Sequence, residues 1–133
     1  MRNKVNKLNE LLTSDAMKVA SCSDFQELTD KRIMITGANG LIGINFLASL
    51  IQIANKVHGI KIFPVIHSEP SEFLLPFLNS EKVQVFRGDL TDEKFIETLP
   101  IADIIIHAAG SGEPVKFMKN TVASLKINTL TTL

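Results

Sequence analysis

Thr36-Gly37-Ala38-Asn39-Gly40-Leu41-Ile42-Gly43 is the stretch of this sequence that decides its fold. It follows residues 32–36, a compact apolar run typical of a β-strand, and it opens residues 41–51, whose apolar spacing is typical of a helix. Three glycines therefore stand where a strand passes into a helix. Gly37 permits a tight turn, Gly40 lets the backbone approach a pyrophosphate, and Gly43 lets the helix lie close to the strand.

The start of the predicted helix would complete a phosphate site. Its first N–H groups have no partner within the helix, and the helix dipole places partial positive charge there. We therefore expect Asn39, Leu41 and Ile42 to bind a cofactor together with the three glycines. A glycine-rich turn can also serve the backbone alone, so the strand before it and the helix after it are the features that favour a nucleotide.

The remainder of the sequence alternates between strands and helices. Strands are predicted over residues 60–66, 83–86 and 104–106, and a helix over residues 91–96 with Thr91 as its cap. Pro64 is awkward in an inner strand, because proline donates no hydrogen bond to a neighbouring strand. A last helix is predicted over residues 120–133. This alternation predicts an α/β fold with a doubly wound parallel sheet.

The N-terminal part differs in pattern from the rest of the chain. Residues 3–12 place leucines and a valine at helical spacing, which predicts a short amphipathic helix, and residues 13–30 resemble a connector that crosses the surface. We therefore divide the chain into an N-terminal helix and linker, residues 1–30, and a dinucleotide-binding domain, residues 31–133.

The composition is that of a globular protein and excludes several functional classes. Apolar residues make up 45% of the 133 residues and charged residues 21%, and 14 basic residues balance 14 acidic ones. This balance removes the electrostatic argument for binding nucleic acid or an anionic membrane, and no apolar run approaches the roughly 20 residues of a membrane span.

Cys22 is the only cysteine, which suits a reducing compartment, so we expect a cytoplasmic protein. The three histidines lie too far apart to suggest a metal site.

Three motifs occur in the order found in one enzyme family. The spacing Gly-x-x-Gly-x-x-Gly of residues 37–43 resembles the fingerprint of the extended short-chain dehydrogenases/reductases. Residues 88–92, Gly-Asp-Leu-Thr-Asp, and residues 107–110, His-Ala-Ala-Gly, resemble that family's motifs after the third and fourth strands. The resemblance covers the family's first half. It implies a Rossmann-type sheet with strand order 3-2-1-4, NAD as cofactor, and a nucleotide-sugar substrate for an epimerase, dehydratase or decarboxylase.

The resemblance also implies roles for single residues. The acidic residue at the position of Asp89 accepts a hydrogen bond from the adenine amino group, and the residue at Leu90 packs beside that ring. Small residues at Ala108 and Ala109, followed by Gly110, let the backbone pass close to the cofactor. His107 matches the histidine that ends the fourth strand in that family, and we favour a structural role for it. Asn128 matches an asparagine that helps to order the family's active-site region. Asp89 could instead cap a helix, and the alanines could serve tight packing.

The sequence departs from the family's pattern where the second strand ends. NAD-specific members place a carboxylate there, but here the position falls on His67 or Ser68. These side chains would tolerate a 2′-phosphate, whereas Glu69 could still reach the ribose and favour NAD. The side chains at this position slightly favour NADP, whereas the analogy with the family favours NAD. We therefore predict NAD as the cofactor, with NADP as the alternative.

A second departure concerns catalysis. The family uses a tyrosine helped by a lysine four residues later, and this chain contains no tyrosine, so no catalytic residue is assigned. The strands expected after the fourth are absent too, which leaves a sheet edge for a homodimer or for a missing C-terminal half to cover. The chain is either a fragment of a longer enzyme, which the unterminated last helix favours, or a short non-catalytic binding or sensor module. A bare structural domain with an empty cleft is the third alternative.

Overall fold

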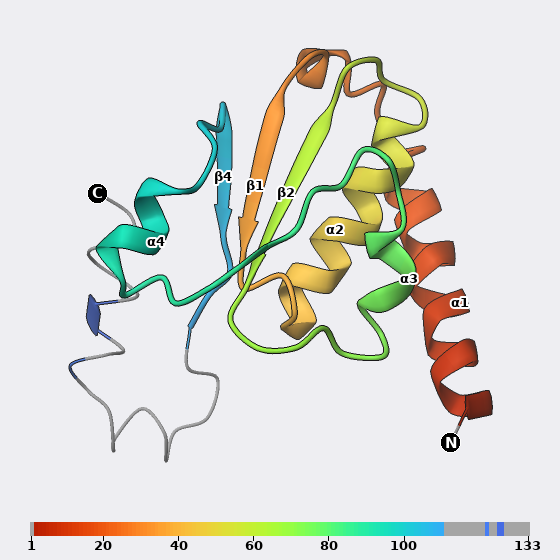
Figure 1. The fold of residues 1–133 in the computed structure, drawn as a ribbon. Helices are drawn as coiled ribbons and strands as arrows, with labels where there is room; N and C mark the ends of the chain where they lie inside the picture. Colours follow the sequence, from red (N-terminus) through yellow and green to blue (C-terminus); the bar gives the residue numbers. More distant parts are fainter. Residues whose placement is uncertain (1, 111–121, 123–124, 127–133) are drawn as a thin grey trace.

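The computed structural model describes residues 2–110 together with 122, 125 and 126. Its centre is a parallel sheet of four strands: β1 (Arg32–Thr36), β2 (Lys61–Ile66), β3 (Phe86–Arg87) and β4 (Ile104–His107) (Figure 1). Their order is β3-β2-β1-β4, as the sequence predicts. All pairings are parallel, so the carboxyl ends of the strands meet at one edge of the sheet.

The helices cover both faces of this sheet. Helix α2 (Leu41–Ala54) and the single turn α3 (Leu75–Leu78) lie on one face, and the short α4 (Glu93–Glu97) lies on the other (Figure 1). Side chains of β1 alternate accordingly: Ile33 and Ile35 join the core cluster under α2, whereas Met34 joins the cluster under α4. Right-handed crossovers require this arrangement, because the chain moves in one direction from β1 to β3 and in the other from β3 to β4.

The N-terminal helix is longer than predicted. Helix α1 spans Arg2–Val19, so much of the expected connector is helical, and a short 3-10 turn, η1 (Gln26–Leu28), follows it. Ala16 and Ala20 are almost fully buried in the same core cluster as α2. Spaced four residues apart, these alanines continue the apolar stripe of Leu12, and their small side chains let α1 lie close to α2. Because polar residues surround the two alanines, this apolar stripe was not recognised in the sequence.

Pro64 explains why the third strand is shorter than predicted. Ile62 turns its N–H and C=O toward the third strand, where the N–H donates to Lys82 O and the C=O accepts from Gln84 N. Pro64, two residues further along β2, turns the same way but has no N–H to offer. The ladder is interrupted there: Val83 makes an isolated bridge, and regular pairing resumes at Phe86.

The cap of α4 is also corrected. Asp92, not Thr91, is the N-cap, and its carboxylate accepts a hydrogen bond from Lys94 N at 3.0 Å. Thr91 is engaged elsewhere, because its hydroxyl donates to Asp89. The predicted helix of residues 120–133 lies outside the described residues, apart from 122, 125 and 126.

An ion pair joins the amino ends of β1 and β4. The carboxylate of Asp103 accepts hydrogen bonds from the backbone N–H of Arg32 at 2.8 Å and from its Nε and Nη2 at 3.0 and 2.9 Å. The Arg32 side chain, and next its backbone N–H, hold the pKa of Asp103 far below its ordinary value. The pair lies at the opposite edge of the sheet from the glycine turn.

Asp103→Asn is therefore expected to destabilise the fold in a pH-dependent way. A carboxyl whose pKa is depressed by folding stabilises the folded state above its unfolded pKa of about 3.9, and this contribution is lost as the pH falls toward the folded value. Urea midpoints of the variant and the unaltered chain should differ most near neutral pH and converge in acid. Asp15→Asn, in the exposed pair with Lys18, is the control. A difference that does not shrink in acid would contradict the argument.

Candidate functional site

The glycine turn between β1 and α2 has the tight geometry that its sequence predicts. Gly37 has φ +69°, and a Cβ added there would lie 2.6 Å from Ala108 O. A Cβ on Gly43 would lie 2.3 Å from Gly37 O and 2.6 Å from Ala38 Cα. All three neighbouring atoms belong to the backbone, which cannot move aside like a flexible side chain. Gly37 thus permits the tight turn that was predicted, whereas Gly43 lets α2 lie close to the turn and not to the strand itself.

Gly40 differs from the other two glycines. It is the N-cap residue of α2, with φ −83° and ψ 165°, which other residues also adopt. An added Cβ would meet only Gly37 O, at 3.3 Å. The first turn of α2 contains no acidic residue and receives no side-chain cap. Its N–H groups and dipole can therefore serve an anion, and Gly40 leaves room for that anion to approach.

A cleft of about 380 Å³ opens at the carboxyl ends of the strands. Eight of the predicted cofactor-binding residues line it: Gly37, Gly40, His67, Asp89, Leu90, Ala108, Ala109 and Gly110. Four further residues that line the cleft were not predicted from the sequence to bind the cofactor: Val65, Ile66, Gly88 and Thr91. Their positions at the end of β2 and beside Asp89 could have revealed them, because the ends of parallel strands meet where open α/β sheets bind ligands.

Asn39 joins the turn to the segment that follows β2. Its Nδ2 donates to Ser68 Oγ at 3.2 Å and to Glu69 O at 2.9 Å, and its Oδ1 accepts from Ser71 N at 2.9 Å. Its side-chain oxygen and nitrogen thus both bind the protein itself. Asn39 holds Ser68 and Glu69 beside the turn.

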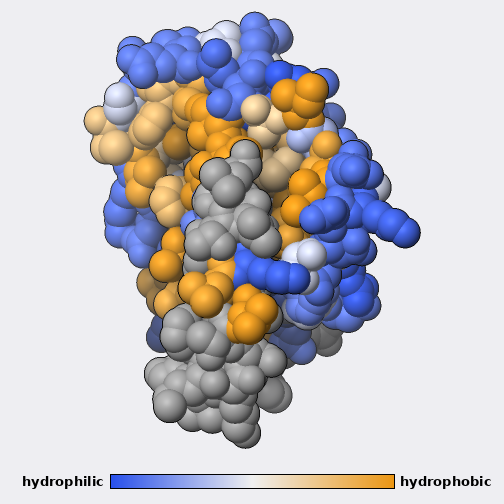
Figure 2. Space-filling model, turned by 90° about the vertical axis from the view of Figure 1, so that its left-hand side faces the viewer, coloured by the Kyte–Doolittle hydropathy of each residue, from blue (hydrophilic) through white to orange (hydrophobic). Residues whose placement is uncertain are grey.

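Leu41 and Ile42 direct their side chains away from this cleft. Both line a separate, larger and mainly apolar groove of about 630 Å³, formed by α1, α2, β1 and β4. Their side chains are mostly exposed, and only their backbone stands at the start of α2. Hydrophobic residues cover much of the surface on the β4 side of the molecule (Figure 2).

Asp89 closes a turn and does not cap α4. Its Oδ1 accepts from Thr91 N at 2.8 Å and from Thr91 Oγ1 at 2.7 Å. These two bonds, and more weakly the charge of His67, lower the pKa of Asp89. The carboxylate is therefore ionised at neutral pH and lies in the cleft as a hydrogen-bond acceptor.

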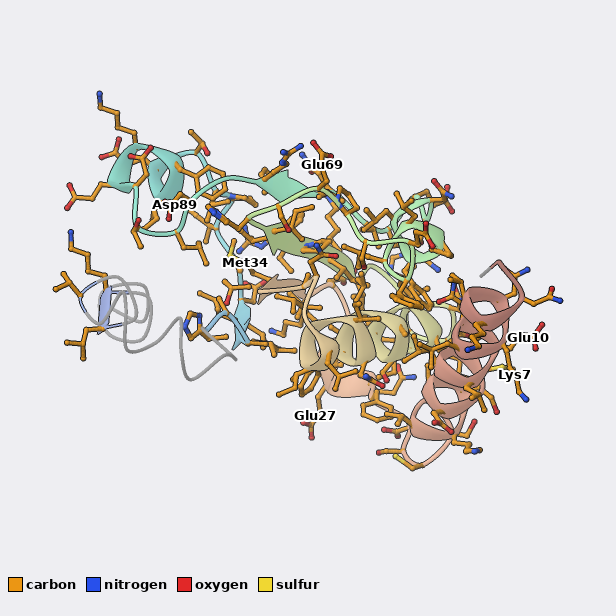
Figure 3. All side chains as sticks on the ribbon, turned by 90° about the horizontal axis from the view of Figure 1, so that it is seen from below. Lys7, Glu10, Glu27, Met34, Glu69 and Asp89 are labelled. Atoms are coloured by element: carbon orange, nitrogen blue, oxygen red, sulfur yellow. The ribbon has the colours of Figure 1, made fainter. Side chains whose placement is uncertain are left out.

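Two charged side chains meet beside the cleft where β2 and β3 end. Arg87 Nη1 donates to Glu69 Oε1, and Arg87 directly precedes the cleft residues Gly88 and Asp89. Figure 3 looks onto this edge of the sheet and shows Glu69 and Asp89 in the segments that follow β2 and β3. The sequence reading considered Glu69 but missed Arg87, although its position next to the Gly-Asp motif was a signal.

His107 stands at the carboxyl end of β4, opposite Thr36 of β1. Its Nδ1 lies 2.7 Å from Thr36 Oγ1, so the ring is engaged with the neighbouring strand. Asn128 lies outside the described residues. Within residues 2–110, 122, 125 and 126, no three histidine, cysteine or carboxylate side chains are grouped to bind a metal ion. No helix in that same part of the chain combines the length and hydrophobicity needed to cross a membrane.

Comparison with known proteins identifies relatives for this architecture. The sequence profile of the NAD dependent epimerase/dehydratase family matches residues 33–133. UDP-glucuronic acid decarboxylase 1 of Danio rerio is 28% identical over 127 residues, which cover 96% of this chain and 29% of the relative.

Solved structures with the same fold include two enzymes. A UDP-glucose 4-epimerase has 20% identity and a TM-score of 0.56 over 76% of this chain and 29% of that one. A short-chain dehydrogenase/reductase of Veillonella parvula in complex with NADP has 18% identity and a TM-score of 0.50 over 77% and 44%. The chain thus spans less than half the length of these three proteins.

Proposed function

The chain belongs to the NAD-dependent epimerase/dehydratase family, and we propose that it is the dinucleotide-binding portion of an oxidoreductase that acts on a nucleotide sugar. One observation carries this proposal: Gly40, the N-cap residue of α2, whose first turn has no side-chain cap, lines the same cleft as Asp89 and Leu90. That cleft could hold a pyrophosphate at the helix and an adenine beside Asp89.

The residues present fit a nicotinamide dinucleotide. Gly40 would leave space for the pyrophosphate, Asp89 would supply an ionised acceptor for the adenine amino group, and Ala108 and Ala109 bring backbone to the cleft beside Gly37. When bound, the dinucleotide would accept and return a hydride. This chain's residues would bind and orient it, with NAD expected from the family and NADP as the alternative.

The sugar chemistry requires residues that this chain does not contain. The 133 residues include no tyrosine, so the Tyr-x-x-x-Lys pair would have to come from further polypeptide. We propose a UDP-sugar-type substrate for the complete enzyme, because the Danio rerio relative is a UDP-glucuronic acid decarboxylase. The same absence of tyrosine favours a second candidate, a non-catalytic dinucleotide-binding or sensor module. A Tyr-x-x-x-Lys sequence encoded after Leu133 would decide for the enzyme.

The apolar groove beside α2 and the edge of β4 would require a further protein surface. Leu41, Ile42 and Phe46 of α2 line this groove and are substantially exposed. We propose that the rest of a longer polypeptide covers this side, or a second copy of the chain in a homodimer. The exposed Cys22 suits the cytoplasm as the compartment.

Calorimetric titration of the 133-residue chain with NAD and NADP tests the proposed function. Saturable binding of either dinucleotide at one site per chain is expected, because the turn and cleft form within residues 36–110. Adenosine serves as a comparison ligand that lacks the pyrophosphate, and it should bind much more weakly. A chain that is folded by circular dichroism but binds neither dinucleotide would refute the assignment.

A further inference from the structure

Asp89 is an exposed side chain whose direction is set by one neighbour. It lines the cleft from the segment between β3 and α4 (Figure 3). Because it is exposed, no core packing holds it in one rotamer. Its Oδ1 accepts hydrogen bonds from the backbone N–H of Thr91 at 2.8 Å and from the Thr91 hydroxyl at 2.7 Å. Among the described residues, no other group donates a hydrogen bond to this carboxylate, so Thr91 is the residue that fixes it.

The Thr91 hydroxyl takes no part in building the surrounding backbone. Asp92 N–H donates to Asp89 O at 3.0 Å and closes the turn, and the Asp92 carboxylate caps α4. At the start of the segment, Gly88 N–H donates to Ile66 O at 3.0 Å and joins it to the end of β2. In the described part of the chain, the hydroxyl binds only the Asp89 side chain. Its removal should therefore free the carboxylate while the turn remains.

We propose that Thr91 is a positioning residue that makes the dinucleotide site selective for adenine, an inference that rests on the proposed function. Because Thr91 occupies Oδ1, the other carboxylate oxygen, Oδ2, is left to accept a hydrogen bond from an adenine amino group in the cleft. Hypoxanthine has a carbonyl oxygen in place of that amino group, so two acceptors would face each other. A fixed carboxylate cannot turn away from this repulsion, whereas a freely rotating one can.

The charge state of Asp89 supports the same role. The hydrogen bonds from the backbone and then from the side chain of Thr91 hold the pKa of Asp89 below its ordinary value. An ionised carboxylate only accepts hydrogen bonds, whereas a protonated one can donate to a carbonyl. Thr91 thus favours one direction of the carboxylate and also the form that distinguishes an amino group from a carbonyl.

Thr91→Val removes the hydroxyl but keeps the shape of the side chain and the backbone N–H. The measured quantity is the dissociation constant of nicotinamide hypoxanthine dinucleotide divided by that of NAD. For the unaltered chain this ratio should exceed roughly tenfold. In Thr91→Val it should fall by roughly three- to tenfold, because the freed Asp89 side chain must be ordered when NAD binds. Thr91→Ser keeps a hydroxyl and should retain most of the selectivity.

Thr98→Val is the matched control. The Thr98 hydroxyl also donates a hydrogen bond of 2.7 Å, to Phe95 O near the end of α4, but Thr98 does not line the cleft. Its loss should leave the ratio unchanged. The dissociation constants are measured by calorimetry, and circular dichroism confirms that each variant is folded. If NADP binds more tightly than NAD, the same ratio is measured with NADP and its hypoxanthine analogue.

A reduced ratio in Thr91→Val, with Thr91→Ser and Thr98→Val close to the unaltered chain, supports the inference. If Thr91→Val keeps the full ratio, or the unaltered chain does not distinguish the two bases, the inference is overturned and the proposed function stands. An equal fall in Thr91→Ser or in Thr98→Val also overturns it, because the hydroxyl of Thr91 would then not be the cause. If the unaltered chain binds neither NAD nor NADP, both the inference and the proposed function fail.

Discussion

Gly43→Ala is expected to destabilise the fold by about 3 kcal/mol or more, although alanine is the better helix former by about 1 kcal/mol. The added methyl would lie 2.3 Å from Gly37 O and 2.6 Å from Ala38 Cα, both backbone atoms. Helix α2 would have to move away from the turn, which would loosen the buried contacts of Ile44 and Leu47. For a domain of ordinary stability, roughly 5–15 kcal/mol, this is a large fraction of the total.

Urea unfolding followed by far-ultraviolet circular dichroism measures this effect, since the chain has neither tryptophan nor tyrosine for fluorescence. Gly40→Ala is the matched control, because its methyl would meet only Gly37 O at 3.3 Å. The control should lose only about 1 kcal/mol, the cost of a poorer N-cap residue, and so unfold at a clearly higher urea concentration than Gly43→Ala. An increase in stability for Gly43→Ala would show that helix propensity dominates and that α2 does not pack closely against the turn.

Gly40→Val is expected to weaken dinucleotide binding at least about 100-fold while the fold persists. Its backbone angles suit any residue, so the cost to α2 should be that of a poor N-cap, about 1 kcal/mol. The two methyl groups would occupy the cleft where the pyrophosphate approaches the first N–H groups of α2. Losing several charge-assisted hydrogen bonds accounts for the size of the effect.

Calorimetry with NAD and NADP measures this loss, and Ser49→Ala is the control. Ser49 lies on the same helix but faces the apolar groove, so its loss should change affinity by less than about threefold. If folded Gly40→Val binds the dinucleotides with unchanged affinity, a pyrophosphate site beside Gly40 is contradicted. Gly40 and Gly43 are only three residues apart, yet one variant should affect ligand binding and the other folding.

The strand order and the glycine turn could be predicted because local rules determine them. A β-favouring run, a glycine turn and a helical apolar period occur in succession, and right-handed crossovers leave few topologies for such a pattern. The long α1 was missed because Ala16 and Ala20 carry little hydrophobic signal in the sequence. Their burial depends on the close approach of α2, which no local pattern records.

Some features of the site also follow from local sequence, whereas others depend on tertiary packing. Sequence by itself determined the strand–turn–helix unit and the backbone freedom at Gly37, because steric limits on φ and the absence of a Cβ act within a few residues. Tertiary structure decided that Asn39 joins two segments, that Leu41 faces the apolar groove and that Arg87 meets Glu69. The direction of a side chain depends on how its helix or strand packs against elements distant in the sequence, so these contacts exist only in the folded chain.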